Sequence, residues 1–161
     1  WSTLFPTSRA AMPADDPRDD GAQRRAERAR DAMYREDYAS QALGIEIAEI
    51  ALGRARATMT VRRDMLNGFG MCHGGLITTL ADTAFAFACN SYDEMTVAAG
   101  FDAEFVKAAR LDDVLTAEAT EQSQAGRLGL YDVTVRNQRG EVVAFLRGRS
   151  YRMRGKSVSG G

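Results

Sequence analysis

Residues 67–90 read NGFGMCHGGLITTLADTAFAFACN, and this stretch decides the fold. From Gly74 to Cys89 the residues are apolar or small, with the single exception of Asp82. The length of the run favours a helix, since strands rarely exceed about ten residues. A carboxylate inside an apolar helix is costly to desolvate unless something compensates it. A helix that opens on two glycines leaves backbone N–H groups free for a partial negative charge. The stretch therefore predicts an oxyanion-binding start and an acid on one helix.

The chain around this helix alternates apolar and polar residues with the period of β-strands. We expect a hairpin that turns at Gly53 and four later strands, over residues 45–47, 55–61, 96–107, 115–122, 128–137 and 141–151. The short connections between these strands fit antiparallel pairing. One helix cannot cover both faces of such a sheet. We therefore expect an α+β fold in which an antiparallel sheet wraps around one helix and a second copy covers what remains.

The two ends of the chain differ in composition from this central part. Residues 1–21 are rich in Ala, Pro, Asp and Arg, which predicts a mobile segment. Residues 22–42 predict a charged surface helix whose narrow apolar stripe holds Met33, Tyr34 and Tyr38. We expect one domain over residues 22–155 and a flexible tail over residues 156–161.

Composition excludes several classes of function. The 161 residues carry a formal net charge of −1, which argues against a general nucleic-acid binder. No apolar run reaches the roughly 20 residues that span a bilayer. One histidine and two cysteines without metal-binding spacing supply too few ligands for a conventional zinc site, so we expect no metal. The cysteines are expected to be reduced thiols of a cytoplasmic protein.

Several motifs match one protein family in combination. They are Asn67, the triplet His73-Gly74-Gly75 and residues 80–82, which read LAD, followed by 84–90, which read AFAFACN. The acid lies nine residues after the histidine and the asparagine six before it. Weaker matches are the turn at Asn137 and residues 145–150, which read FLRGRS. Over about residues 43–152 the chain resembles the hotdog-fold acyl-coenzyme A thioesterases, most closely the phenylacetate-degradation subfamily.

The resemblance implies a hotdog fold, in which a curved sheet wraps around the long helix. It implies a homodimer whose sheets join edge to edge and which usually pairs into a homotetramer. It also implies a hydrolase that cleaves phenylacetyl-CoA or its ring-hydroxylated relatives, with no cofactor, since coenzyme A is part of the substrate. Two alternatives stay open: a non-catalytic CoA-ester binding protein and a hotdog hydratase or dehydratase.

Three residues are the candidate catalytic groups. The backbone N–H of Gly74, or of Gly75, can stabilise the oxyanion because no side chain blocks its approach, and the family's donor falls on Gly74. Asp82 can act as general base or as nucleophile. Asn67 matches the family residue that places the water or the carbonyl. The structural alternatives are tight packing of the glycines, an Asp82 bonded to backbone or threonine hydroxyls, and a simple Asn-Gly turn.

Candidate substrate-binding residues are His73, Gly75, Asn90, Arg147 and Arg149. We expect His73 to brace the loop rather than act as a base. Asn90 can line the acyl pocket or cap the helix end. The two arginines suit the phosphates of coenzyme A, or else keep a solvated strand edge charged.

The spacing of Gly74 and Asp82 predicts an oligomeric site. Eight residues of helix separate them by roughly 12 Å, whereas one reacting carbonyl needs both groups within about 3–3.5 Å of the reacting atoms. Two antiparallel copies of the helix would bring Gly74 of one chain close to Asp82 of the other. We therefore expect an active site shared between two subunits.

Overall fold

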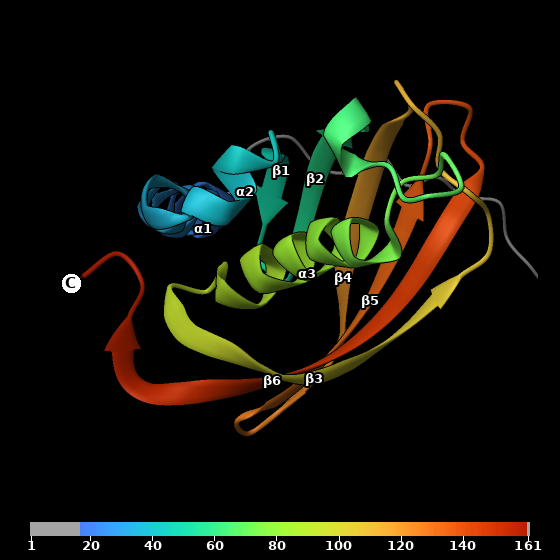
Figure 1. The fold of residues 1–161 in the computed structure, drawn as a ribbon. Helices are drawn as coiled ribbons and strands as arrows, with labels where there is room; N and C mark the ends of the chain where they lie inside the picture. The colour runs from blue at the N-terminus through green and yellow to red at the C-terminus, as the bar shows by residue number, and fades with distance from the viewer. Residues whose placement is uncertain (1–16, 161) are drawn as a thin grey trace, which may run out of the picture.

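Helix α3 (Gly74–Asn90) lies against the concave face of a curved antiparallel sheet in the computed structural model, which describes residues 17–160 (Figure 1). The elements in chain order are α1 (Pro17–Glu36), α2 (Tyr38–Ala42), β1 (Glu46–Ala51), β2 (Arg54–Thr60), the short 3₁₀ turn η1 (Arg63–Met65), α3, β3 (Glu94–Phe105), β4 (Val114–Ala125), β5 (Leu128–Arg136) and β6 (Val142–Ser157). The strands follow the order β1-β2-β4-β5-β6-β3, and all five pairings are antiparallel. The expected α+β arrangement, a sheet wrapped around one central helix, is confirmed.

Small residues on the concave face let α3 approach the sheet closely. Ala57 pairs with Ala117 across β2 and β4, and both are fully buried. On β6, a Cβ atom at Gly148 would lie 2.8 Å from the ring of Phe85, so only glycine leaves room for this aromatic side chain. Phe85 in turn packs against Tyr131 of β5, with ring centroids 5.4 Å apart. The apolar side of α3 thereby becomes the centre of the core.

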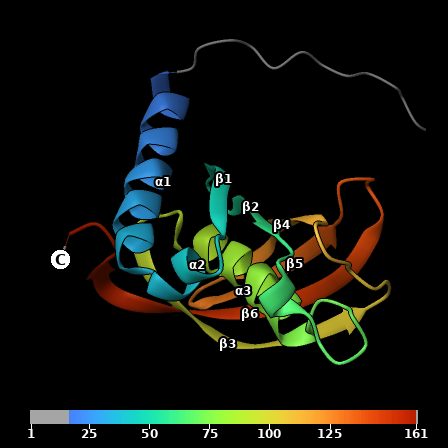
Figure 2. The ribbon, with the colours of Figure 1, turned by 45° about the horizontal axis from the view of Figure 1, so that its top comes forward.

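The N-terminal helices cover the β1 end of the sheet, where Figure 2 shows α1 standing beside β1. Tyr34 packs against Phe87 of α3 with ring centroids 6.4 Å apart and donates its hydroxyl hydrogen to the carbonyl oxygen of Ile45 at 2.7 Å. The expected apolar stripe is wrong at Tyr38, which is 70% exposed. Asp37 interrupts the helix and caps α2 through a hydrogen bond from the N–H of Ser40, which turns the chain away.

Helix α1 begins at Pro17, five residues before the expected start, and proline is well tolerated at the first helical position. Residues 17–21 of the expected mobile segment are therefore helical, while residues 1–16 lie outside the described part of the chain. None of the helices described between residues 17 and 160 has the length and apolarity that a membrane span requires.

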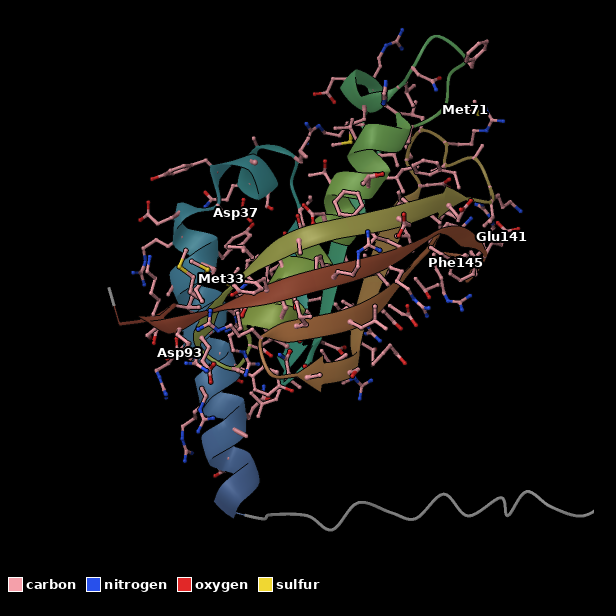
Figure 3. All side chains as sticks on the ribbon, turned by 90° about the horizontal axis from the view of Figure 1, so that it is seen from below. Met33, Asp37, Met71, Asp93, Glu141 and Phe145 are labelled. Carbon is pink, nitrogen blue, oxygen red and sulfur yellow. The ribbon has the colours of Figure 1, made fainter. Side chains whose placement is uncertain are left out.

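The C-terminal end differs from the expected flexible tail, because β6 continues to Ser157 alongside β3. Asp93, labelled in Figure 3, binds the residues at and just after the end of β6. Its carboxylate accepts hydrogen bonds from the backbone N–H groups of Val158 and Ser159 and from the hydroxyls of Ser157 and Ser159. These donors lower the pKa of Asp93 even though burial opposes them. Sequence periodicity did not indicate this anchor, because the tail is polar.

Candidate active site

The start of α3 leaves one backbone donor free. His73 is the N-cap residue, and its Nδ1 atom accepts the N–H of Gly75 at 3.2 Å. The carbonyl oxygen of His73 accepts the N–H groups of Leu76 and Ile77 at 2.9 and 3.3 Å. Within the described residues, the N–H of Gly74 has no such partner. The structure therefore distinguishes between the two glycines: Gly75 is capped, and Gly74 keeps a free donor at the positive end of the helix.

Gly74 also lines a pocket of about 390 Å³. Its walls are Asn67, Met71, Cys72, Gly74, Ile77, Phe105, Val106, Lys107, Ala108 and Ala109. Of these residues, only Lys107 is charged, and its ammonium group pairs with Glu141. The lining suits a largely apolar chain that carries one polar group to be held at Gly74.

Asn67 shapes the loop that borders this pocket. Its Oδ1 atom accepts the backbone N–H groups of Phe69 at 2.9 Å and Met71 at 3.2 Å. The Asn-Gly turn considered as a structural alternative is thus present. The Nδ2 group of Asn67 has no hydrogen-bond acceptor among residues 17–160, so this side chain also keeps a donor available, and it borders the same pocket as Gly74.

Asp82 lies on the part of α3 that faces away from the sheet, and its side chain is half-buried. Burial raises the pKa of this carboxyl group. Nothing in the described part of the chain donates a hydrogen bond to it or pairs with it as a cation. The threonine hydroxyls considered as hydrogen-bond donors to Asp82 bind other atoms. Thr78 and Thr79 each donate to a backbone carbonyl oxygen one turn earlier, at 2.9 Å. A half-buried carboxylate without a partner is typical of a functional group rather than a structural one.

The hydroxyl group nearest to Asp82 in sequence, that of Thr83, also forms hydrogen bonds with other residues. One turn after Asp82 the chain has Ala86, which carries no hydroxyl group. Thr83 donates its hydroxyl hydrogen to the carbonyl oxygen of Thr79 at 2.8 Å and lies 3.2 Å from the Ser40 hydroxyl. Thr83 therefore ties α3 to α2 and is not free to hold a water near Asp82.

Asn90 does not face the pocket. Its amide donates to the carbonyl oxygens of Ala86 at 2.9 Å and Thr96 at 2.8 Å, and its Oδ1 atom accepts the N–H of Thr96 at 2.8 Å. The side chain is 5% exposed. These contacts do not support its expected role in substrate binding. Asn90 instead fastens the end of α3 to the beginning of β3.

Arg147 and Arg149 project from the outer face of the sheet, opposite α3. Gly148 between them faces Phe85, and side chains alternate along a strand. Arg147 forms two hydrogen bonds with Asp132, at 2.7 and 2.9 Å, and Arg149 forms one with Asp102 at 2.6 Å. The structure does not bring either arginine to the pocket at Gly74. The sequence pattern suggested phosphate binding because it does not reveal the acidic partners on the neighbouring strands.

Sequence reasoning missed one side of the pocket, which the end of β3 and residues 106–109 supply. No sequence signal marks Phe105 or Lys107, since their relation to Gly74 depends on the pairing of β3 with β6. The two thiols add no obvious reactivity. Burial raises the pKa of Cys72 and raises that of Cys89 to about 12. Across residues 17–160 there is no cluster of three His, Cys, Asp or Glu residues that could hold a metal ion.

Comparison with known proteins identifies the class. The Thioesterase superfamily model matches residues 69–144. The acyl-coenzyme A thioesterase PaaI of Escherichia coli strain K12 is 44% identical over 124 residues, which cover 77% of this chain and 89% of that protein. The chain therefore belongs to the thioesterase superfamily of hotdog enzymes.

Two solved structures are similar to the fold described above. The E. coli PaaI protein, from the phenylacetic acid degradation operon, matches with a TM-score of 0.82 and 41% identity, covering 84% of this chain and 98% of that chain. A hypothetical thioesterase protein from Streptococcus pneumoniae TIGR4, solved with coenzyme A, matches with a TM-score of 0.67 and 28% identity, covering 70% of this chain and 88% of that chain.

Proposed function

We propose that this enzyme hydrolyses acyl-CoA thioesters to a free acid and coenzyme A, with phenylacetyl-CoA and its ring-hydroxylated relatives as preferred substrates. The observation that carries the proposal is the free N–H of Gly74, a residue that lines an apolar pocket. The same helix carries Asp82, which has no partner among residues 17–160. The E. coli relative is an acyl-coenzyme A thioesterase from a phenylacetic acid degradation operon, and the pneumococcal relative binds coenzyme A. These two relatives support the substrate class.

The Gly74 N–H supplies the electrostatic part of catalysis. Attack on a thioester moves negative charge onto the carbonyl oxygen, and one preorganised donor is worth about 2.7–4 kcal/mol in comparable enzymes. The positive end of α3 adds to this donor. The amide of Asn67, which lines the same pocket, can hold the attacking water or the carbonyl group.

Asp82 supplies the attacking group by one of two routes. As a general base it takes a proton from water while the water oxygen bonds to the thioester carbon, and the collapsing intermediate expels the CoA thiolate. As a nucleophile it displaces the thiolate itself, and water then hydrolyses the mixed anhydride. A partial desolvation of Asp82 suits both routes, because it makes the carboxylate more basic.

We propose that each site is shared by two subunits. Asp82 does not line the pocket at Gly74 of its own chain. Strand β3 is an uncovered sheet edge twelve residues long, with half-exposed Met95, Val97 and Phe101. Such an edge is prone to pair with another chain. Pairing of β3 with its symmetry mate would set two α3 helices side by side in a homodimer, and two dimers would form the homotetramer. We expect a cytoplasmic protein, since Cys72 and Cys89 are free thiols.

Release of free thiol from a panel of acyl-CoAs tests the activity, with wild type and Asp82→Ala compared. Hydrolysis that survives Asp82→Ala would contradict the mechanism. Tight CoA-ester binding without turnover would instead favour a binding protein, and addition or removal of water from the acyl chain would favour a hydratase or dehydratase.

Mixed dimers test the shared site. Asn67→Ala and Asp82→Ala subunits are each expected to be inactive alone. After random re-association in equal amounts, half of the dimers are hybrids with one intact site, so roughly a quarter of wild-type activity should return. Mixtures that stay inactive, although subunit exchange is shown by native mass spectrometry, would refute the shared site.

A further inference from the structure

The ring of Phe105 lies directly over the start of α3. A Cβ atom placed on Gly74 would come within 3.1, 3.3 and 3.5 Å of three carbons of this ring. In a helix both the Cα–Cβ direction and the free N–H groups point toward the N-terminus. The aromatic ring therefore lies beside the one free donor of the helix start, at the last position of β3.

Packing within one subunit does not account for this placement. Phe105 is 53% exposed, although it borders a pocket that also contains Gly74 and Asn67. A half-exposed aromatic side chain gains little from burial compared with a core residue. The ring nevertheless lies so close to Gly74 that a Cβ atom there would have to push it aside by a few tenths of an ångström.

We propose that Phe105 shields the Gly74 oxyanion donor from water and forms the apolar wall against which the thioester carbonyl is placed. This inference rests on the proposed hydrolysis of acyl-CoA. A hydrogen bond from N–H to a developing oxyanion strengthens as the local dielectric constant falls, and a ring on one side of the donor excludes the water that would otherwise compete. The same contact disfavours a side chain at position 74, because the ring would have to move to make room for it.

The first test replaces Phe105. Phe105→Ala is expected to lower kcat about tenfold with KM changed less than about threefold, because the lost shielding acts mainly on the transition state. Phe105→Leu keeps an apolar wall and should recover most of kcat. Phe145→Ala is the matched control, since Phe145 is a half-exposed phenylalanine on the outer face of the sheet (Figure 3). Its kcat should remain that of wild type.

A double-mutant cycle separates shielding from a general loss of structure. In Gly74→Ala the added methyl group pushes against the ring of Phe105, and kcat should fall by at least about tenfold. In the double variant with Phe105→Ala the methyl group has room, so kcat should lie within about twofold of that of Phe105→Ala alone. Strict additivity of the two losses, or a Phe105→Ala enzyme with wild-type kcat, would overturn the proposal. A fall in kcat matched by Phe145→Ala would also overturn it.

The outcomes distinguish this inference from the proposed function. If wild type hydrolyses acyl-CoA and Asp82→Ala does not, while the Phe105 variants are unaffected, only the shielding role fails. If wild type releases no thiol from any acyl-CoA, both fail.

Discussion

The Nδ1 atom of His73 accepts the backbone N–H of Gly75 at 3.2 Å, and this hydrogen bond separates the roles of two adjacent glycines. It satisfies Gly75 and leaves Gly74 as the free donor. Because the imidazole Nδ1 is an acceptor here, the neutral ring carries its proton on Nε2. The single histidine of the chain therefore acts on the backbone of the site.

Replacement of the cap should separate bracing from base catalysis. We expect His73→Ala to lower the free energy of unfolding by about 1 kcal/mol, as for other lost N-caps, while His73→Asn retains the cap. The activity of His73→Asn should stay within about tenfold of wild type, because loss of a general base costs about 10²–10⁴-fold. Urea denaturation and steady-state kinetics measure the two effects. Equal inactivation of both variants, by a hundredfold or more, would show that the imidazole takes part in the chemistry.

Asp82→Asn should lower kcat at least about 10²-fold, since the amide is neither base nor nucleophile. In wild type, the active form is the carboxylate, and burial raises its pKa. The rate should therefore rise as pH increases through a value above that of an ordinary aspartate, and then level off. The pH dependence of kcat/KM measures this value, and a profile that stays flat down to pH 4 would contradict the assignment.

The carboxyl group of Asp82 should also lower the free energy of unfolding at neutral pH. A carboxyl whose folded pKa is raised favours the folded state in its protonated form, and this contribution is lost as pH rises through the folded pKa. At neutral pH the ionised Asp82 is therefore destabilising, and Asp82→Asn should melt at a higher temperature than wild type. Differential scanning calorimetry at pH 7 and at pH 4 checks the sign. The gap between the two proteins should narrow at the lower pH.

Asn90→Ala should destabilise the protein without a specific effect on substrate affinity. The change leaves both backbone groups of Thr96 without their side-chain partner in a buried place, which costs about 2–3 kcal/mol. Asn90→Asp keeps the acceptor for the Thr96 N–H but turns a second acceptor toward its carbonyl oxygen, so it should not rescue. Denaturant midpoints measure the cost. A raised KM in a fully folded variant would restore Asn90 to the substrate site.

Arg147→Gln should change little. Its ion pair with Asp132 is exposed on the outer face, and such pairs contribute less than about 1 kcal/mol. The KM for acyl-CoA tests whether the guanidinium group also contacts the nucleotide. If KM rises several-fold in the variant, and if this difference from wild type becomes smaller when salt is added, Arg147 belongs to the binding site.

Much of the fold was predictable from local pattern. The length of the apolar run from Gly74 to Cys89 favours a helix, which the structure contains as Gly74–Asn90. The period-two strands around it leave one helix to be wrapped by one sheet. The boundaries were less predictable where polar contacts determine them. Asp37 divides the N-terminal helix through its cap, and Asp93 holds a polar C-terminal end that has no periodic signal.

The sequence by itself determined the helix, its free start at the two glycines and the acid eight residues later, because these depend on local spacing along one chain. Only the tertiary structure decided which glycine keeps its donor, that Phe105 lies against it, and that Arg147, Arg149 and Asn90 are engaged elsewhere. Each of these outcomes depends on contacts between residues distant in sequence or on hydrogen-bond geometry. The periodicity of a single segment encodes neither these long-range contacts nor the hydrogen-bond geometry.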